Sequence, residues 1–339
     1  YSNEISVVVN PRPVAEITGG ATICLGESSV IRVNITVGTG PYELDIENLG
    51  TISGYINNSD ITVSPTVTTT YRLLRVRDSK PCEILAPSPN LMGSVEVKVR
   101  ALPVITSSPL SQTICEYNSL NFTVNATGDD LTYQWFVKKT TTFEPVTDGG
   151  VYNGANTKTL SIYGPARDMN SYAYHAVVTG CATDKTSDDA ILTINTAPQI
   201  NTQPKDSTIC VGNNAVFEVA AEGTAISYQW QYNTGSGFGT VPENANFSGT
   251  TTNKLVVTNA SGSFNNYSFR VMINGTCPAP VSSNIVVLRV NVAPVPTVHP
   301  TDKSVCENGG PKVFVGNGTG KIDSLRWQVN TGSGWTDIY

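Results

Sequence analysis

The side chains in this chain whose type and spacing suggest chemistry are its seven cysteines. Four of them stand in similar phrases (ATICLGES, QTICEYNS, STICVGNN and KSVCENGG) that recur about every 95 residues, and they are Cys24, Cys115, Cys210 and Cys306. The other three fall late in successive intervals, and they are Cys82, Cys181 and Cys277. One early and one late cysteine in each interval favour disulfides that form in an oxidising compartment.

Other chemistries receive less support from the sequence. Zinc sites need closely spaced ligands, but the chain has no Cys-x-x-Cys pair and only two histidines, His175 and His299. Neither histidine is accompanied in the sequence by the Ser and Asp residues that a nucleophilic triad requires, so both histidines are expected to be structural. We therefore predict that this chain is not an enzyme and that it holds no metal and no cofactor.

Two acidic pairs, Asp129 with Asp130 and Asp188 with Asp189, could bind calcium near loops. The D-x-D-x-D-G pattern of a calcium-binding loop is absent. Solvated turn carboxylates are therefore the simpler interpretation of both pairs.

The recurring phrase indicates one module that is repeated along the chain. Prolines at matching positions mark the joints, and they are Pro11, Pro103, Pro198 and Pro294. We predict the last strand of a preceding repeat at 1–10, whole repeats at 11–102, 103–197 and 198–293, and the N-terminal part of a further repeat at 294–339. The chain is accordingly expected to be a window on a longer protein.

Composition excludes several classes of partner. Charged residues make up 14% of the chain and the net charge is -6, so basic patches that could neutralise nucleic-acid phosphates are not expected. No apolar run reaches the roughly 18 to 20 residues needed to cross a bilayer, so no membrane-spanning segment is predicted.

Aligned on their cysteines, the second and third repeats place the same residue types at the same offsets. Around Phe122, apolar and polar residues alternate with the period of a strand that buries one face. The counterparts in the fourth repeat are shifted by one residue. The aromatic residues predicted to fill the core are Phe122, Phe217 and Phe314, together with Trp135, Trp230 and Trp327.

About seven short strands per repeat, with a Trp on the third strand and a Tyr-rich sixth strand, are typical of an immunoglobulin-like sandwich. We therefore predict an all-β fold of tandem immunoglobulin-like β-sandwich domains in an extended rod, with essentially no α-helix. The first repeat has Leu44 in place of the Trp and is predicted to be a subtype with a different core. Trp335, in the hairpin after the third strand, is the better candidate for contact with a partner, although a loop anchor is the simpler interpretation.

Two disulfide patterns must be weighed. Pairing within repeats would join Cys24 to Cys82, Cys115 to Cys181 and Cys210 to Cys277. A staggered pattern would join Cys24 to Cys181 and Cys115 to Cys277, leaving Cys306 unpaired in the chain and Cys82 and Cys210 to pair with repeats outside it. In the sandwich topology the two cysteines of one repeat lie at opposite poles, roughly 25 Å apart, whereas a disulfide needs Cα atoms within about 7 Å. We therefore prefer the staggered pattern.

The repeats resemble the immunoglobulin-like repeats of giant cell-surface adhesins in Bacteroidota, of which the gliding-motility adhesins of the SprB kind are an example. The resemblance lies in the start of the repeat at 22–26, in SDITVSPTVTTTYRL, and in the later YQW and NTGSG runs. It implies export by type IX secretion and location at the cell surface, on the extracellular face of the outer membrane. The implied partners are neighbouring repeats of the same chain and, through regions outside it, the outer-membrane secretion and motility machinery.

The sequence therefore leads to a non-enzymatic structural stalk that projects an adhesive region and bears force in surface attachment or gliding. The alternative is a set of carbohydrate-binding or accessory modules of a secreted polysaccharide-degrading enzyme, which would need exposed aromatic residues on one face. A eukaryotic immunoglobulin receptor is disfavoured, because residues such as Phe122 and Val271 stand where strand cysteines usually occur.

Overall fold

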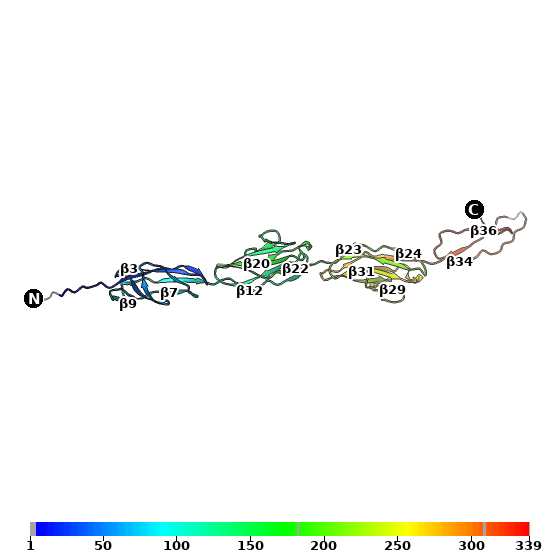
Figure 1. Ribbon diagram of the computed structural model, residues 1–339. Helices are drawn as coiled ribbons and strands as arrows, with labels where there is room; N and C mark the ends of the chain where they lie inside the picture. Colours follow the sequence, from blue (N-terminus) through cyan, green and yellow to red (C-terminus); the bar gives the residue numbers. More distant parts are fainter. Residues whose placement is uncertain (1–4, 182, 308–309, 339) are drawn as a thin grey trace. The chain divides into compact units, whose positions relative to one another are not determined.

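The computed structural model describes residues 5–181, 183–307 and 310–338, and these residues form strands joined by turns, with two single 3-10 turns and no α-helix (Figure 1). The chain divides into two compact units, Tyr1–Thr193 and Ile194–Tyr339. The prediction of an all-β fold built from immunoglobulin-like sandwiches is confirmed, whereas the rod shape and the repeat boundaries stay predictions.

The first sandwich is built from three small sheets. Their strand orders are β10-β1-β3-β6, β2-β11-β7 and β5-β4-β8-β9. The strands are β1 (Val14–Gly19), β2 (Thr22–Cys24), β3 (Ser29–Val37), β4 (Tyr42–Ile46), β5 (Gly50–Tyr55), β6 (Ile61–Val63), β7 (Thr69–Tyr71), β8 (Leu73–Arg77), β9 (Glu83–Leu85), β10 (Leu91–Met92) and β11 (Val95–Arg100).

The second sandwich has a main sheet in the order β13-β22-β20-β16-β17, a second sheet in the order β14-β19-β18, and a pair β12-β15. Its elements are β12 (Val104–Ser107), β13 (Gln112–Cys115), β14 (Leu120–Thr123), β15 (Asn125–Thr127), β16 (Thr132–Lys138), β17 (Phe143–Pro145), β18 (Tyr152–Asn153), β19 (Thr159–Ile162), η1 (Arg167–Met169), β20 (Ala173–Thr179), β21 (Asp184–Thr186) and β22 (Ala190–Asn195).

The third sandwich repeats this arrangement strand for strand, with the orders β24-β33-β31-β27-β28, β25-β30-β29 and β23-β26. Its elements are β23 (Gln199–Thr202), β24 (Ser207–Cys210), β25 (Ala215–Glu218), β26 (Ala220–Glu222), β27 (Ser227–Asn233), β28 (Phe238–Thr240), β29 (Phe247–Ser248), β30 (Lys254–Val257), η2 (Gly262–Phe264), β31 (Ser268–Asn274), β32 (Val281–Ser282) and β33 (Val286–Asn291).

The cores of the second and third sandwiches are centred on Trp135 and Trp230, which are fully buried. Phe122 packs against Trp135 with ring centroids 6.5 Å apart, and Phe217 packs against Trp230 at 6.4 Å. Each indole N–H donates to a backbone carbonyl at 2.9 Å, so these large rings are buried without losing a hydrogen bond. In the first sandwich the corresponding Leu44 is fully buried, as expected of a core without Trp.

The last segment differs from the sandwiches. It contributes β34 (Val295–Val298), β35 (Asn317–Thr319), β36 (Trp327–Asn330) and β37 (Trp335–Ile338), which form two two-stranded sheets. The prediction that Phe314 and Trp327 are core residues is wrong for this structure, because they are 50% and 41% exposed. In the described part of residues 294–338, the two two-stranded sheets supply no opposing apolar layer to cover these side chains.

The expected strand at 1–10 is also not found over residues 5–10, and residues 1–4 lie outside the described residues. Ile5, Val7, Val8 and Val9 are each more than three-quarters exposed. A strand needs a neighbour to accept and donate its backbone hydrogen bonds, and no strand of the described chain pairs with this segment.

Candidate functional site

The candidate site is the joint between the first and second sandwiches, and it begins with Cys24. Cys24 ends β2, which pairs in parallel with β11 so that Cys24 lies opposite Arg100. The backbone N–H of Leu25 donates to the carbonyl of Arg100 at 2.9 Å, and Glu27 accepts the N–H of Cys24 at 2.8 Å. These bonds hold the sulfur beside the strand from which the chain leaves the first sandwich.

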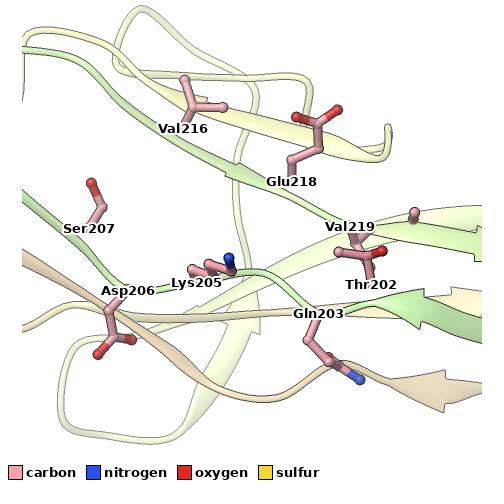
Figure 2. Close-up of a pocket in the computed structure, with 9 residues that line it drawn as sticks. Thr202, Gln203, Lys205, Asp206, Ser207, Val216, Glu218 and Val219 are labelled. Atoms are coloured by element: carbon pink, nitrogen blue, oxygen red, sulfur yellow. The ribbon is translucent and has the colours of Figure 1, made fainter.

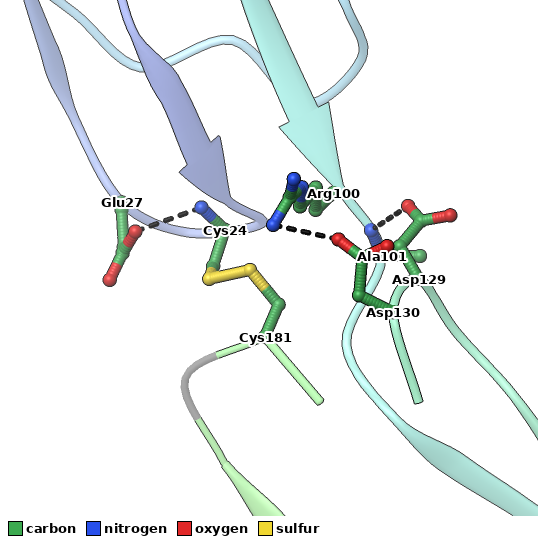
Figure 3. The surroundings of a disulfide bond; sticks show 7 residues. All are labelled: Cys24, Glu27, Arg100, Ala101, Asp129, Asp130 and Cys181. Atoms are coloured by element: carbon green, nitrogen blue, oxygen red, sulfur yellow. Dashed lines mark hydrogen bonds and ion pairs between the residues drawn. A yellow bond between two sulfur atoms is a disulfide. The ribbon is translucent and has the colours of Figure 1, made fainter. Parts of the chain in front are cut away.

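Cys181 belongs to the second sandwich, in the loop that follows β20. It forms a disulfide with Cys24 across 157 residues of sequence, with Cα atoms 5.5 Å apart (Figure 3). That separation lies in the middle of the range for natural disulfides. The bond therefore joins consecutive sandwiches covalently, at a second point besides the backbone.

The backbone link itself is held by the turn after β15. Asp129 accepts the N–H of Ala101 at 2.7 Å through a carboxylate oxygen and donates its own N–H to the Ala101 carbonyl at 3.3 Å. Beside it, Arg100 and Asp130 form an ion pair at 2.7 Å (Figure 3). Because both of these side chains are substantially exposed, the ion pair contributes little stability.

A glycine lets this turn approach the link closely. Gly128 has a φ of +141°, and a Cβ there would lie 2.9 Å from the carbonyl oxygen of Leu102. On the other side, Gly180 approaches the ring of the buried Pro103, to which a Cβ would lie 3.3 Å away. The joint proline is thus enclosed between two loops of the second sandwich.

We call this arrangement the linker clasp: a glycine lies close to a linker carbonyl, and the residue after the glycine donates its backbone N–H to a linker carbonyl. The linker clasp recurs where the chain enters the later repeats. Thr224 donates its N–H to the Thr196 carbonyl at 3.1 Å and accepts the Thr196 N–H through its hydroxyl at 2.9 Å. Lys321 donates its N–H to the Val292 carbonyl at 3.1 Å. The glycines that precede these residues, Gly223 and Gly320, would carry a Cβ within 3.0 and 2.6 Å of a linker carbonyl.

Sequence reasoning did not find the linker clasp, although a signal for it exists. Gly128 and Gly223 follow the cysteine of their repeat by the same number of residues, and Gly320 follows its cysteine by one more. This is the same one-residue shift that Trp327 shows, so the three glycines are equivalent. A search for glycines at a fixed offset would have marked the turn.

The disulfide prediction within repeats is wrong in this structure. Cys24 is bonded to Cys181, while Cys82, Cys210 and Cys306 are free thiols. The physical reason is the distance argument from the sandwich topology. The cysteine at the end of the early strand and the cysteine of the late loop lie at opposite ends of one sandwich, too far apart for a disulfide. Cys115 and Cys277 are disulfide-bonded cysteines, and the pairing of these two with each other stays a prediction.

The acidic pairs serve the fold. Besides the roles of Asp129 and Asp130 at the joint, Asp188 accepts the Ser108 hydroxyl at 2.9 Å. Asp189 pairs with His175 at 3.1 Å, so this histidine has an acidic partner that sequence reasoning did not assign to it. Among the residues that the structure describes, no group of three His, Cys, Asp or Glu side chains could hold a metal ion.

An aromatic residue opens the second strand of the central hairpin in each later repeat. Phe143 stacks on His175 with ring centroids 3.9 Å apart, and Phe238 lies under Arg270 at 4.3 Å. Trp335 holds the same place and is 69% exposed. The contacts identify Phe143 and Phe238 as anchors of their hairpins, and the interpretation of Trp335 as a loop anchor stays a prediction.

A surface hollow of about 390 Å³ lies on the third sandwich, where the first strand changes sheets at the buried Pro204 (Figure 2). Val216 and Glu218 lie on the strand across from Lys205. One of its polar side chains, Asp206, accepts the backbone N–H of Val287 at 2.8 Å. The hollow is therefore a consequence of the sheet change, which follows from the missing N–H of proline.

Tyr174, in the core of the second sandwich, has a pKa well above the usual value for tyrosine. Burial raises the pKa of Tyr174, and its hydrogen bond with Tyr152, 3.1 Å between hydroxyl oxygens, raises it further. The third sandwich has Phe247 and Phe269 at these positions, 6.2 Å between centroids. The tyrosine pair is thus a variant of an apolar contact, and it supplies no reactive group near neutral pH.

Comparison with solved structures supports the fold alone. A three-immunoglobulin-domain fragment of titin with Glu-to-Ala substitutions matches with a TM-score of 0.59 and 12% identity, over 84% of this chain and 99% of that one. An I-band fragment of titin matches with a TM-score of 0.58 and 12% identity, over 83% and 99%. The N-terminal eight domains of the Down syndrome cell adhesion molecule match with a TM-score of 0.50 and 16% identity, over 83% of this chain and 37% of that one.

No protein-family model and no curated protein sequence matches the chain. In the described residues no helix is long and apolar enough to span a membrane. The sheet topology and the structural neighbours define the class: the chain is a tandem array of immunoglobulin-like β-sandwiches.

Proposed function

We propose that this chain is a non-enzymatic stalk of a large secreted cell-surface adhesin, which projects an adhesive region and bears force in surface attachment or gliding. The observation that carries the proposal is the disulfide between Cys24 and Cys181, which joins two consecutive sandwiches. A bond between modules contributes nothing to the chemistry of either one. It restricts their relative movement, which is what a stalk under load requires.

The recurring linker clasp supports the same function. Three successive entries into a repeat use a glycine and one backbone hydrogen bond from the same turn to hold the incoming linker. Such a repeated contact at each linker is expected where the function of the array depends on how neighbouring modules are connected. We propose that the repeats form an extended rod with these joints.

We further propose that the staggered disulfides continue along the stalk, with Cys115 bonded to Cys277. Cys210 ends β24 opposite Asn291, as Cys24 ends β2 opposite Arg100. A hollow of about 310 Å³ lies beside Cys210, lined by linker residues and by Lys321. We propose that it receives the loop cysteine of a following repeat, and that Cys82 pairs in the same way with a preceding one.

The resemblance to adhesin repeats of Bacteroidota supplies the setting of the proposal. It includes type IX secretion, location on the extracellular face of the outer membrane, and coupling to secretion and motility machinery through regions outside this chain. The alternative, carbohydrate binding by the modules, would require aromatic faces open to a sugar. Phe143 and Phe238 instead stack on side chains of their own sheet.

Cleavage between the second and third sandwiches tests the proposal. A protease site inserted beside residues 197–198 should give fragments that stay together on a denaturing gel without reductant and separate with it. A Cys115→Ser variant is the matched control and should separate in both lanes. Fragments of the parent protein that separate without reductant would contradict the stapled stalk, and tight binding on a glycan array would favour the alternative.

A further inference from the structure

We infer that the Cys24–Cys181 disulfide carries pulling force past the linker and past most of the core strands of the first two sandwiches. The inference rests on the proposed function, because it concerns what happens when a stalk is loaded at its ends. It assigns the disulfide a mechanical task that differs from stabilising either sandwich.

The covalent path through the chain gives the first step. Tension applied at the two ends follows the taut route, which runs to Cys24, crosses the disulfide, and continues from Cys181. The residues between the two cysteines form a closed loop of sequence separation 157. They cannot be drawn out by end-to-end tension while the bond is intact, whatever the stability of the sandwiches.

The second step is what this loop contains. It includes nearly all strands of the first sandwich and the Trp135 core of the second. On the loaded route lie β1 and β2 in the first sandwich, and β21 and β22 in the second. Each sandwich is therefore loaded through strands at one end of its chain. Some core residues lie on the loaded route, such as Ile17 of β1 and Leu192 of β22, but most of the buried aromatic and aliphatic residues lie inside the loop.

The third step concerns the linker, which also lies inside the loop. Its contacts with the second sandwich are the clasp hydrogen bond from the Asp129 N–H, the bond that the Asp129 carboxylate accepts from Ala101, and an exposed ion pair of Arg100 with Asp130. Bonds of this kind are individually weak and would open first in a chain of elements loaded in series. Because the disulfide lies in parallel with the linker, opening of these contacts would not lengthen the chain while the bond is intact, so their task is to set the orientation of the joint.

The predicted bond between Cys115 and Cys277 would extend the same principle. Two routes would then connect Cys24 to Cys277, one through residues 24–115 and one through residues 181–277. Each contains fewer than 100 residues, whereas the backbone between these cysteines has more than 250. The staggered pattern thus limits extension at every joint it spans, which pairing within repeats would not do.

Force spectroscopy on the whole chain, held by its two ends, tests the inference. A Cys115→Ser/Cys277→Ser background leaves only the Cys24–Cys181 bond, so residues 25–180 should stay hidden in oxidised protein. At about 3.5 Å per extended residue, reduction should release roughly 550 Å of contour length. When reductant is added under constant force, this length should appear as separate unfolding steps, because both cores were still folded.

A variant with Cys24→Ser and Cys181→Ser in the same background is the control, and its contour length should not depend on reductant. A single jump of the full hidden length after reduction would overturn the inference, because it would show that the cores had already unfolded inside the loop. Peptide mapping of the same sample separates the two claims. Absence of the disulfide would contradict the stapled stalk itself, whereas an intact disulfide with unfolded cores would contradict only the mechanical role.

Discussion

The joint before Pro103 and the joint before Pro294 are built on the same plan but are held differently. Both have a glycine with positive φ against a linker carbonyl and a backbone hydrogen bond from the next residue, Asp129 in one and Lys321 in the other. The first joint adds a disulfide and a carboxylate acceptor. At the second, the equivalent cysteine, Cys210, is an exposed free thiol.

The difference separates two ways of fixing a joint. The linker clasp needs only the turn near the start of the entering repeat, so it forms where that turn is present. The disulfide needs the late loop of the entering repeat, which brings Cys181 to Cys24 in the first joint and has no counterpart in the described part of residues 294–338. The orientation of the linker is therefore specified by the turn near the start of the entering repeat, whereas the disulfide requires the late loop of that repeat.

Removal of the disulfide should give the largest effect. Closing a loop of separation 157 stabilises by up to about 5 kcal/mol according to chain entropy. We expect a Cys24→Ser/Cys181→Ser variant to lose a comparable free energy of unfolding in guanidinium titrations of the first two sandwiches. A Cys210→Ser variant should match the parent, and an equal loss in that variant would break the distinction between the joints.

Substitution of the clasp glycine should have the next largest effect. Gly128→Ala introduces a Cβ 2.9 Å from a carbonyl oxygen and places alanine at a φ of +141°, so we expect a loss of about 2 to 3 kcal/mol. Gly149→Ala is the control, since Gly149 has a φ of +129° but no atom within 4 Å of the position that a Cβ would take. It should lose about 1 kcal/mol, and equal losses in thermal unfolding would show that close approach to the linker is unimportant.

The side chain of Asp129 should contribute less than the glycine. Asp129→Ala removes the acceptor of the Ala101 N–H, and we expect a loss of about 1 kcal/mol. Lys321→Ala should be close to neutral, because Lys321 acts on its linker through its backbone N–H. Amide hydrogen exchange at Ala101 and Lys321, whose N–H groups donate the two bonds, provides the measurement. Faster exchange at Ala101 in the Asp129 variant alone would support the comparison, and unchanged exchange there would contradict it.

The ion pair between Arg100 and Asp130 should contribute least. Its side chains are 41% and 66% exposed, so we expect Asp130→Asn to cost less than about 0.5 kcal/mol, and the cost should vanish in about 1 M salt. Thermal unfolding at low and high salt provides the measurement. A loss above about 1 kcal/mol that persists in high salt would mean that this pair, and not the clasp, holds the first joint.

Much of the fold could be predicted from the sequence because short-range patterns encode it. The alternation around Phe122 identifies a strand with one buried face, and equal offsets identify Trp135 and Trp230 as equivalent core positions. The pairing of Cys24 with Cys181 could be predicted because the two cysteines of one repeat lie at opposite ends of the sandwich. That argument requires the strand order of the sandwich but no knowledge of side-chain contacts.

Other features could not be predicted because they depend on which atoms meet. The role of Asp129 required knowledge that its turn reaches the linker, and the stacking of Phe143 on His175 required the pairing of two distant strands. Trp327 shows the converse. Its sequence position is that of a core residue, yet its burial requires a second apolar layer that the described part of residues 294–338 does not supply.

The most direct test of the account is a tryptic peptide map of oxidised, alkylated protein without reductant. The account predicts one cross-linked species that joins the peptide carrying Cys24 to the peptide carrying Cys181, and alkylated thiols at Cys82 and Cys210. A cross-link between the peptides carrying Cys24 and Cys82 would contradict the account, because it would place both sulfurs within one sandwich and leave the first joint without a covalent bond.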